Sequence, residues 1–352
     1  WDDQDLAAEV LYGGYLASKD RYAAIFCDEA QDFTSLELEV VVQLSRFSHK
    51  RILPEELRRV PFVFAGDPLQ TLNPTGFRWE ALQADFHEKF SSLVEKQQRK
   101  ETVKPNYKEL NYNYRSNQGT VYFGNLISLF RTTLLGLRNT NPQEAWWPEG
   151  KENPLWYDID DPDVAQWLKE RPDLVKIINC EEGEETLFAQ EDPILQHTER
   201  EDNVFRNVFS PVRAKGLEFP DVVLYRFGEK FPQGFEKRLQ ELMSKDLERF
   251  QESEERLPFE YFLNRLYVAA SRSKKRVYIV DTKKAWQEFW KFATSQELLD
   301  VMLELTKKEP AWGNHICAPL AGDIKSDEKG LRRNPAEQAA EYEEQGQRDR
   351  DP

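Results

Sequence analysis

Two carboxylates that directly follow an apolar run could carry out phosphate chemistry. Asp28 and Glu29 come after the run 22–27 and open the string DEAQDF. At the end of a buried strand Asp28 could hold Mg²⁺, mostly through water, because Mg²⁺ gives up its water ligands reluctantly. Glu29 could then take a proton from an attacking water molecule. A strand that simply ends in solvated acids is the alternative, but the six-residue string is much rarer than an acid pair.

An amide and a group of aromatic residues follow the next apolar run. Gln70 ends the string GDPLQ after the run 61–65, and its side chain could hydrogen-bond a terminal phosphate or the water that attacks it. Phe77 and Trp79 then lie on either side of Arg78. Such rings can stack on nucleobases, each contact being worth about 1–3 kcal/mol. For Trp79 alone, an ordinary contact in the core is an equally good explanation.

Three later strings carry two arginines, a glycine and a glutamate. Arg115, in NYRS, lies at the start of a helix predicted at 117–137 and could contact a phosphate through two N–H groups. In AKGLEF, Gly216 permits a tight turn and Glu218 could accept a ribose hydroxyl. Arg272 ends LYVAASR and is placed to act as an arginine finger, a contribution of about 10³–10⁵ in rate. Taken alone, Arg115 would be an ordinary surface residue.

The segments that must position these residues predict an α/β fold with parallel sheets. Strands at 22–27 and 61–65, both read as buried on two faces, flank a helix at 35–47. Strand, helix and strand without a hairpin signal give a parallel sheet, and its ligands bind at the carboxyl ends of the strands. Further helices are expected at 4–18, 81–100, 117–137, 163–170, 234–256, 258–272, 284–292 and 295–307, and further strands at 174–178, 204–212, 222–225 and 276–280.

Two α/β units are expected, joined near residue 105. The first spans 1–105 and the second 106–310, and a pocket is expected between them. Residues 141–162, rich in Trp, Pro and Asp, indicate a surface connection, and 311–352 a charged, disordered tail. No apolar stretch is long enough to span a bilayer, and the three cysteines suggest neither a disulfide framework nor a metal site.

The order of the strings is their most specific property. DEAQDF, GDPLQ with FRW, NYRS, AKGLEF and LYVAASR, in this order and at these gaps, resemble the UvrD/Rep-like branch of superfamily 1 DNA helicases over residues 20–282. The resemblance implies two RecA-like domains with ATP and Mg²⁺ bound between them, of which the first is incomplete in this chain. It also implies single-stranded DNA as the partner and DNA repair as the setting, while RNA stays open as a partner.

The resemblance also implies a role for each matching residue. Asp28 and Glu29 match motif II, which binds Mg²⁺ and activates water. The other matches to the nucleotide site are Gln70 in motif III, Arg115 in motif IV, Gly216 and the ribose-binding Glu218 in motif V, and Arg272 in motif VI. Phe77, Arg78 and Trp79 match the stretch of motif III that meets single-stranded DNA, and Tyr267 matches a motif VI tyrosine whose role stays open.

Three departures from the family bear on function. No G-x-x-x-x-G-K-[ST] loop occurs, since the only Gly-Lys pair, at 150–151, is followed by an acid. The usual Thr-Leu-His-Ser of motif V reads Ser-Pro-Val-Arg, which leaves Ser210 and Arg213 to meet DNA there. Only residues 117–209 separate motifs IV and V, too few for a large helical insertion, and this argues against processive strand separation.

The acidic composition also argues against a nucleic-acid binder, although only weakly. The net charge of the 352 residues is −15, whereas phosphate contacts are usually made by basic patches. A motor that feeds one strand through a narrow channel needs only local basic and aromatic groups. Many of the acidic residues also lie in 234–256 and after Gly322, in segments that are predicted to be peripheral.

The chain is therefore expected to be part of an ATP-dependent helicase or translocase on single-stranded DNA. It begins at Trp1 without an initiator Met, so we expect a fragment of a longer cytoplasmic protein (nuclear in a eukaryote) whose amino-terminal part carries the phosphate loop. By itself the chain is expected to hydrolyse no ATP. The alternative is a regulatory or scaffolding protein that keeps a helicase-like core without motor activity. Nothing in the chain bears on a third reading, an ATPase coupled to a nuclease or defence function.

Overall fold

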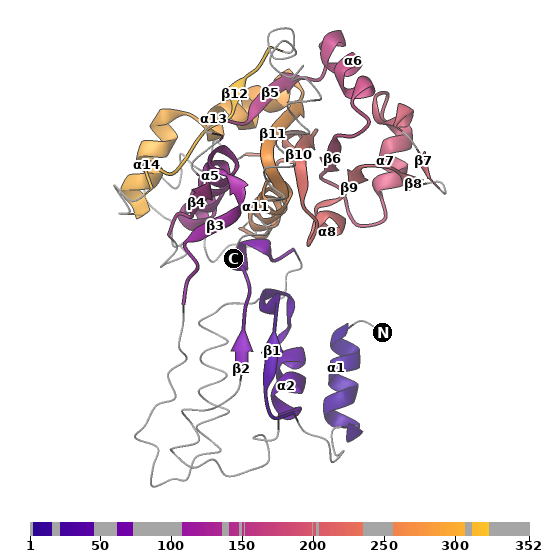
Figure 1. Ribbon diagram of the computed structural model, residues 1–352, viewed down its shortest axis with the longest axis vertical. Helices are drawn as coiled ribbons and strands as arrows, with labels where there is room; N and C mark the ends of the chain where they lie inside the picture. The colour runs from indigo at the N-terminus through magenta and orange to yellow at the C-terminus, as the bar shows by residue number, and fades with distance from the viewer. Residues whose placement is uncertain are drawn as a thin grey trace, which may run out of the picture. The chain divides into compact units, whose positions relative to one another are not determined.

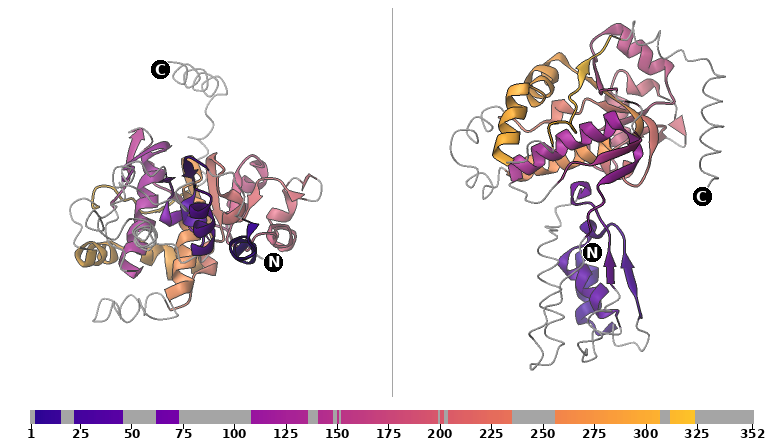
Figure 2. Two further views of the ribbon diagram at one scale, coloured as in Figure 1. Left: turned by 90° about the horizontal axis from the view of Figure 1, so that it is seen from below. Right: turned by 60° about the vertical axis from the view of Figure 1, so that its left-hand side comes forward.

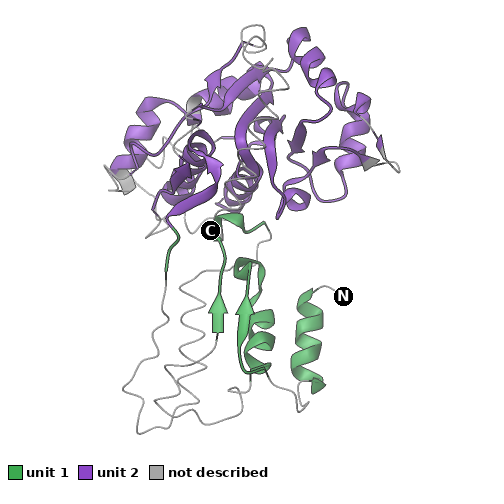
Figure 3. Cartoon of the chain, in the orientation of Figure 1, with its two compact units in different colours: residues 1–110 green, residues 111–352 purple. Residues whose placement is uncertain are grey.

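The computed structural model is mixed α/β with parallel sheets, as the sequence predicts. It describes residues 3–15, 22–45, 62–72, 108–135, 141–147, 150, 152–198, 200–201, 204–234, 256–306 and 312–323. The chain forms two compact units, residues 1–110 and 111–352, against an expected junction near residue 105 (Figure 3). None of the described helices is long and apolar enough to cross a membrane.

Unit 1 contains the predicted succession of strand, helix and strand. Its elements are α1 (Asp3–Tyr12), β1 (Ile25–Cys27), α2 (Ser35–Gln43) and β2 (Phe62–Phe64), and β1 and β2 pair in parallel. The sequence fixes the start of α2 through a reciprocal cap. Thr34 Oγ1 accepts a hydrogen bond from the backbone N of Glu37 at 3.3 Å, and Glu37 Oε2 accepts one from the backbone N of Thr34 at 2.7 Å.

The prediction that both strands of unit 1 are buried on two faces is wrong. Phe26 and Val63 lie opposite each other in the parallel pair and are 75% and 50% exposed. Partners in register point to the same side of a sheet, so one face of this two-stranded sheet is open among the described residues. The neighbouring Cys27, which points the other way, is buried. An apolar run in the sequence therefore does not show whether a strand is buried on one face or on both.

Unit 2 is built on one six-stranded sheet in which every neighbouring pair is parallel. The strand order is β12-β5-β11-β10-β6-β9 (Figure 1). The strands are β5 (Leu155–Asp158), β6 (Val175–Ile178), β9 (Val208–Phe209), β10 (Phe219–Tyr225), β11 (Ser273–Asp281) and β12 (Leu320–Ala321). The three strands that are plainest in the sequence, β6, β10 and β11, are neighbours in the middle of the sheet.

Helices pack against this sheet in two groups (Figure 2). The first group, α6 (Pro162–Glu170) and α7 (Glu185–Glu191), shares one buried apolar cluster with Tyr157, Val223 and Tyr278 of the sheet. The second group, α5 (Gln118–Leu135) and α11 (Arg256–Ala270), packs together and against β10 and β11 through residues outside that cluster. Because side chains alternate along a strand, both faces of β10 are buried, as parallel sheets require.

Two predictions are wrong, one for the residues after α5 and one for Arg115, which precedes α5. Residues 141–162 are not a surface connection, because they contain β4 (Glu144–Trp147) and β5, and the β5 residues Trp156 and Tyr157 are buried between β11 and β12. The Pro and Asp residues around β5 hid its apolar core in the sequence. β4 pairs in parallel with β3 (Tyr112–Asn117), so Arg115 lies in a strand and not at the start of a helix.

The remaining elements follow the predicted pattern with different ends. The strand expected at 204–212 is divided between β8 (Val204–Phe205), which is antiparallel to β7 (Arg200–Glu201), then β9, and then the helical turn α8 (Pro211–Ala214). The helix expected at 284–292 runs through α12 (Lys283–Ala285), a π-helical turn (Trp286–Trp290) and α13 (Lys291–Ala293), and that at 295–307 is α14 (Gln296–Thr306).

Part of the expected tail belongs to the fold of unit 2. Trp312 is buried, and β12 pairs with β5. The rest of the expected tail, the helix expected at 81–100 and residues 235–255 of the expected charged helix lie outside the described residues. All three cysteines are free, with Cys27 and Cys180 buried and Cys317 partly buried.

Candidate functional site

Asp28 and Glu29 occupy the carboxyl end of β1, where the sequence predicts them. Both side chains are exposed, and the backbone N of Glu29 donates to Asp28 Oδ1 at 2.9 Å. Glu29 has φ 50° and ψ 40°, the left-handed conformation. That conformation is uncommon for a residue other than glycine and tends to occur where a chain must aim a side chain. The two adjacent carboxylates are therefore exposed at a turn of unusual backbone conformation directly after the strand.

Gln31, which the sequence analysis did not single out, joins the two strings of unit 1. Its side chain is fully buried. Its Nε2 donates to Glu29 Oε2 in a close contact, and its Oε1 accepts from the backbone N of Asp67 at 3.0 Å. One amide thus holds the candidate base of DEAQDF against the turn of GDPLQ. Its position inside the acidic string was the only signal for it in the sequence.

Gly66 leaves the space that this amide occupies. A Cβ built on Gly66 would collide with Gln31 Oε1 and come within 3.1 Å of the backbone N of Ala30. The backbones are tied at the same point, since Ala30 N donates to Ala65 O and Ala65 N donates to Cys27 O, both at 2.8 Å. The glycine of GDPLQ therefore permits a close approach of two chain segments, which a Cβ could keep only if Gln31 moved.

Gln70 lies in the same network, three residues after Asp67. Asp67 caps the 3₁₀ turn Pro68–Gln70 by accepting at Oδ1 from the backbone N of Leu69, 2.9 Å away. Its Oδ2 accepts from Gln70 Nε2 at 3.1 Å. Unit 1 thus brings together Asp28, Glu29 and Gln70 of the predicted site through Gln31 and Asp67. Phe77, Arg78 and Trp79, which are predicted to contact single-stranded DNA, lie outside the described residues.

The donor set of unit 1 fits a hydrated Mg²⁺ better than a metal enclosed by protein. Among the described residues there is no group of three or more His, Cys, Asp or Glu side chains that could hold a metal ion. Mg²⁺ usually keeps several waters and takes only one or two carboxylates together with substrate phosphates. Asp28, exposed at the end of a parallel strand, meets that requirement, and the remaining ligands would have to be water and phosphate.

In unit 2 the predicted residues Arg115 and Glu218 are in contact. Arg115 Nη1 lies 3.4 Å from Glu218 Oε1, and Arg115 Nη2 donates to the backbone O of Ser271 at 2.9 Å. Lys274, which sequence reasoning missed, places its Nζ 2.9 Å from the other carboxylate oxygen of Glu218. Three segments far apart in the chain therefore meet here: β3, the residues just before β10, and the start of β11.

The charges around Glu218 keep its carboxyl group ionised. Partial burial acts to raise the pKa of Glu218, but the ammonium of Lys274 and the guanidinium of Arg115 outweigh it, and the pKa is lowered. An ionised carboxylate accepts hydrogen bonds and donates none, as a contact to a sugar hydroxyl requires. Such a hydroxyl would compete with the two cations that Glu218 already contacts.

Arg272 is placed differently from the expectation. Its side chain is only 2% exposed, with Nε donating to Val268 O at 3.2 Å and Nη1 to Leu217 O at 3.4 Å. The guanidinium thus joins the last turn of α11 to the loop before β10 and is turned inward. Gly216, in that loop, has φ 79°, the conformation for which a glycine is expected. A phosphate could be reached by Arg272 only after its side chain changed rotamer.

Ser210 and Arg213 are the two residues of the altered motif V that are predicted to contact DNA. Of these, only Arg213 is accessible. Ser210 is fully buried and caps α8, its Oγ accepting from the backbone N of Arg213 at 3.3 Å. Arg213 is partly exposed, with Nη1 4.0 Å from Glu185 Oε2 and its guanidinium carbon 5.7 Å from the centre of the Phe209 ring. The buried Glu185 also accepts from the backbone N of Ser210, so Ser210 has a structural role.

An exposed aromatic surface is formed by Tyr112 and Tyr114 of β3 and Trp146 of β4. The ring centre of Trp146 is 4.9 Å from that of Tyr114 and 5.7 Å from that of Tyr112. All three side chains are exposed, which is unusual for a cluster of large rings. The sequence signal was present in the alternation of Tyr112 and Tyr114, which puts both rings on one face of β3. Flat aromatic partners such as nucleobases could stack there.

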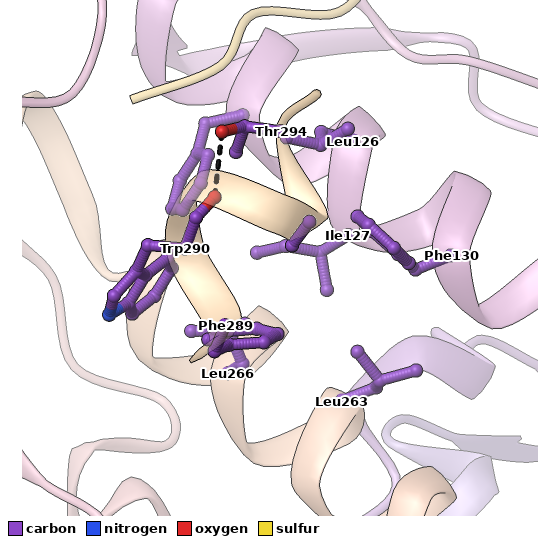
Figure 4. Close-up of a pocket in the computed structure, with 10 residues that line it drawn as sticks. Leu126, Ile127, Phe130, Leu263, Leu266, Phe289, Trp290 and Thr294 are labelled. Atoms are coloured by element: carbon purple, nitrogen blue, oxygen red, sulfur yellow. Dashed lines mark hydrogen bonds between the residues drawn. The ribbon is translucent and has the colours of Figure 1, made fainter. Parts of the chain in front are cut away.

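The interior between α5, α11 and the turn Trp286–Trp290 offers no room for a ligand (Figure 4). The pocket there has a volume of only about 10 Å³ and is lined mainly by apolar side chains such as Phe130, Leu266 and Phe289. A volume of about 10–15 Å³ is needed for a single water. This part of unit 2 is packed core, so the candidate site consists of the surface groups described above.

Comparison with known proteins gives no assignment. A scan against protein-family models and a search of curated proteins both find no match.

Proposed function

We propose that the chain belongs to an ATP-dependent motor, a helicase or translocase of the UvrD/Rep type that acts on single-stranded DNA. The observation that carries the proposal is the meeting of Arg115, Glu218 and the end of LYVAASR in unit 2. These residues come from three of the five strings that carry the resemblance. Nothing in their sequence separation requires contact, and a shared role toward one nucleotide explains why they meet.

Unit 1 would supply the chemistry of hydrolysis. Mg²⁺, held by Asp28 and water, would neutralise charge on the phosphates of ATP. Glu29 would accept a proton from the attacking water at its carboxylate, which Gln31 orients. Gln70, held by Asp67, would donate its amide to the terminal phosphate. No residue of the sequence provides a phosphate-binding loop, so hydrolysis requires a form of the protein that carries one.

Unit 2 would hold the nucleotide and part of the DNA strand. Arg115 would contact a phosphate through its guanidinium, and the exposed rings of Tyr112, Tyr114 and Trp146 could stack on a base. Glu218 would accept a ribose hydroxyl, and Arg213 would meet a strand phosphate. The contacts expected from Phe77 and Trp79 stay predictions.

The decisive test replaces the proposed base. In a form of the protein that carries a phosphate loop, we expect Glu29→Gln to lower hydrolysis of ATP in the presence of single-stranded DNA by about 10²–10⁴-fold, the usual contribution of a general base. Binding of a fluorescent ATP analogue should be retained, because an amide still accepts a hydrogen bond from Gln31 or water.

The matched control is Glu9→Gln on the exposed face of α1, which should hydrolyse ATP at the normal rate. A normal rate in Glu29→Gln would remove Glu29 as the base. Hydrolysis by the purified 352-residue chain itself would contradict the need for a separate phosphate loop.

The inward placement of Arg272 favours a second candidate, a regulatory or scaffolding protein with a helicase-like core. A guanidinium that bonds to Val268 and Leu217 carbonyls serves the fold without any nucleotide. A form that carries a phosphate loop but shows no ATP hydrolysis, with or without single-stranded DNA, would favour this candidate over the motor.

A further inference from the structure

A cavity of about 150 Å³ lies in unit 2, between α6, β6 and the turn Leu195–His197. None of the residues proposed above for ATP or DNA lines it. Leu168, Ile194 and Leu195 are apolar residues of its lining, and Lys169, Lys176 and His197 are also among the lining residues. A cavity of this volume can hold a molecule of about six heavy atoms.

Lys176 occupies a position where a hydrophobic residue is expected. It lies in the middle of β6, paired with Val208 on one side and Val223 on the other. Its side chain is on the same face of the strand as Ile178, which belongs to the apolar cluster beneath α6 and α7. Lys176 is only 2% exposed. Lysine is almost never buried this completely unless its charge is compensated.

The protein compensates the Lys176 ammonium only in part. An ammonium has three N–H donors, and within the described part of the chain Lys176 Nζ makes one hydrogen bond, to the backbone O of Arg171 at 3.0 Å. Asp173, the acid whose charge acts on Lys176, already forms an ion pair with Arg171, at 2.8 Å between Nη2 and Oδ2. No carboxylate is among the residues that line the cavity.

The group nevertheless carries a positive charge at neutral pH. Burial lowers the pKa of Lys176 to about 8, with Asp173 opposing and Arg171 adding to the effect. This pKa lies above neutral pH, so the charged ammonium is the favoured form there. Lys176 is also among the residues that line the cavity, and a buried cation with unused donors at a cavity attracts a small anion.

We propose that this cavity is a binding site for a small organic carboxylate. The carboxylate oxygens of the ligand would accept hydrogen bonds from the unused N–H groups of Lys176. A short apolar part of the ligand would pack against Leu168 and Leu195. Lys169 and His197 are exposed, so Lys176 is the one buried cationic side chain among the residues that line the cavity. A single buried ammonium matches a monoanion, whereas a phosphate dianion needs several donors around it. The apolar walls favour an organic anion over an inorganic one. The proposal is independent of ATP and DNA, because none of the residues proposed for their binding lines the cavity.

Butyrate, which has six heavy atoms, is a suitable probe for the 352-residue chain. Ligand-observed NMR titration should show saturable binding of butyrate to a single site. Butyramide, its neutral counterpart of the same size, should bind at least about tenfold more weakly, because it lacks the charge. Inorganic phosphate should not displace butyrate at equal concentration.

Two variants assign the effect to Lys176. Lys176→Met keeps the length of the side chain and removes the charge, and it should weaken butyrate binding by at least about tenfold. Lys284→Met, at a lysine whose side chain is 79% exposed on the helical segment after β11, should bind butyrate as the unmodified chain does.

The proposal fails if butyrate shows no saturable binding, if butyramide binds equally well, or if Lys176→Met retains the affinity. Tighter binding of phosphate than of butyrate would overturn the choice of ligand class. If Lys176→Met does not fold, as circular dichroism would show, the comparison of butyrate with butyramide on the unmodified chain decides alone.

Discussion

At the scale of single residues, a buried amide organises the candidate site of unit 1. Gln31 contacts Glu29 through its nitrogen and the backbone of Asp67 through its oxygen, so one side chain sets the distance between two turns. A carboxylate held by a fixed donor has a defined orientation, which general base catalysis requires. The strained conformation of Glu29 and the lack of a side chain at Gly66 both serve this contact.

Replacing this amide should lower the stability of unit 1. We expect Gln31→Leu to reduce the free energy of unfolding by about 1–3 kcal/mol, because the backbone N of Asp67 loses its acceptor in a partly buried position. Gln43→Leu on α2 serves as the control, since its hydrogen bond to Glu39 is long, at 3.5 Å. Urea denaturation followed by fluorescence measures both. An equal change in the two variants would contradict a special role for Gln31.

At the scale of elements, one carboxylate ties together the ends of β10, β11 and the π-helical turn. Asp281, fully buried at the end of β11, accepts from the backbone N of Gly228 at 2.6 Å and from Trp290 Nε1 at 2.9 Å. Its other oxygen accepts from the backbone N of Thr282 at 3.0 Å. The irregular turn of the helix is thus matched to a partner that places the Trp290 indole in the core.

This carboxylate should make stability depend on pH. Burial raises the pKa of Asp281 from 3.8 to about 6, although bonds from Trp290 and backbone N–H groups oppose it. The folded state therefore binds the proton more tightly than the unfolded state, and the stability contributed by protonation is fully present below about pH 3.8 and lost as pH rises through about 6.

The Asp281→Asn variant isolates this contribution. The free energy of unfolding is compared at pH 7 and at pH 4 in both proteins. The difference between the two pH values should favour the folded state more in the unmodified chain than in Asp281→Asn. Acids with lowered pKa, such as Glu218 and Glu185, act in the opposite direction in both proteins and cancel in the difference. Denaturant curves at a series of pH values measure it, and parallel pH profiles for the two proteins would contradict the assignment.

At the scale of the whole molecule, the chain consists of two units with very different cores. Unit 2 buries a six-stranded sheet between helices, whereas the two described strands of unit 1 leave Phe26 and Val63 exposed. Stability follows the apolar area removed from water, so the units are not expected to unfold as one two-state system. The net charge of −15 belongs to the chain as a whole and does not describe either candidate site.

A fragment of residues 108–323 should therefore fold without the rest of the chain. It contains every strand of the six-stranded sheet. We expect the full chain to show two thermal transitions by circular dichroism, and the fragment to reproduce the one at higher temperature. Gln31→Leu should shift only the lower transition of the full chain. A fragment that lacks a cooperative transition would show that the core of unit 2 depends on unit 1.

The fold was predictable where long apolar runs form central strands. Residues 222–225 and 276–280 lie in β10 and β11, buried on both faces, and nothing in their composition obscured them. Leu155–Asp158 was missed because Pro and Asp surround its aromatic residues, and tertiary packing overrode that local signal. Arg115 was placed at a helix start because the pairing of β3 with β4 joins segments that local patterns do not connect.

The candidate site was predictable only in its parts. The acids and amides of unit 1 follow their strands as expected, because strand ends are visible in the sequence. The partners Gln31, Lys274 and Glu185 were not visible, since each acts through a contact with a distant segment. The burial of Arg272 depends on the position of the Leu217 carbonyl in another loop, which no pattern within LYVAASR encodes.

The free cysteines have a consequence for oxidative chemistry. Burial raises the pKa of the Cys27 thiol, and it raises the pKa values of Cys180 and Cys317 to about 12. Peroxides and alkylating reagents attack the thiolate and not the thiol. All three thiols are therefore protonated at neutral pH, and the buried Cys27 and Cys180 are also shielded by the surrounding side chains. Cys27 lies in unit 1 and the other two cysteines lie in unit 2. Reaction of a thiol with an alkylating reagent would therefore report local unfolding of the unit that contains it.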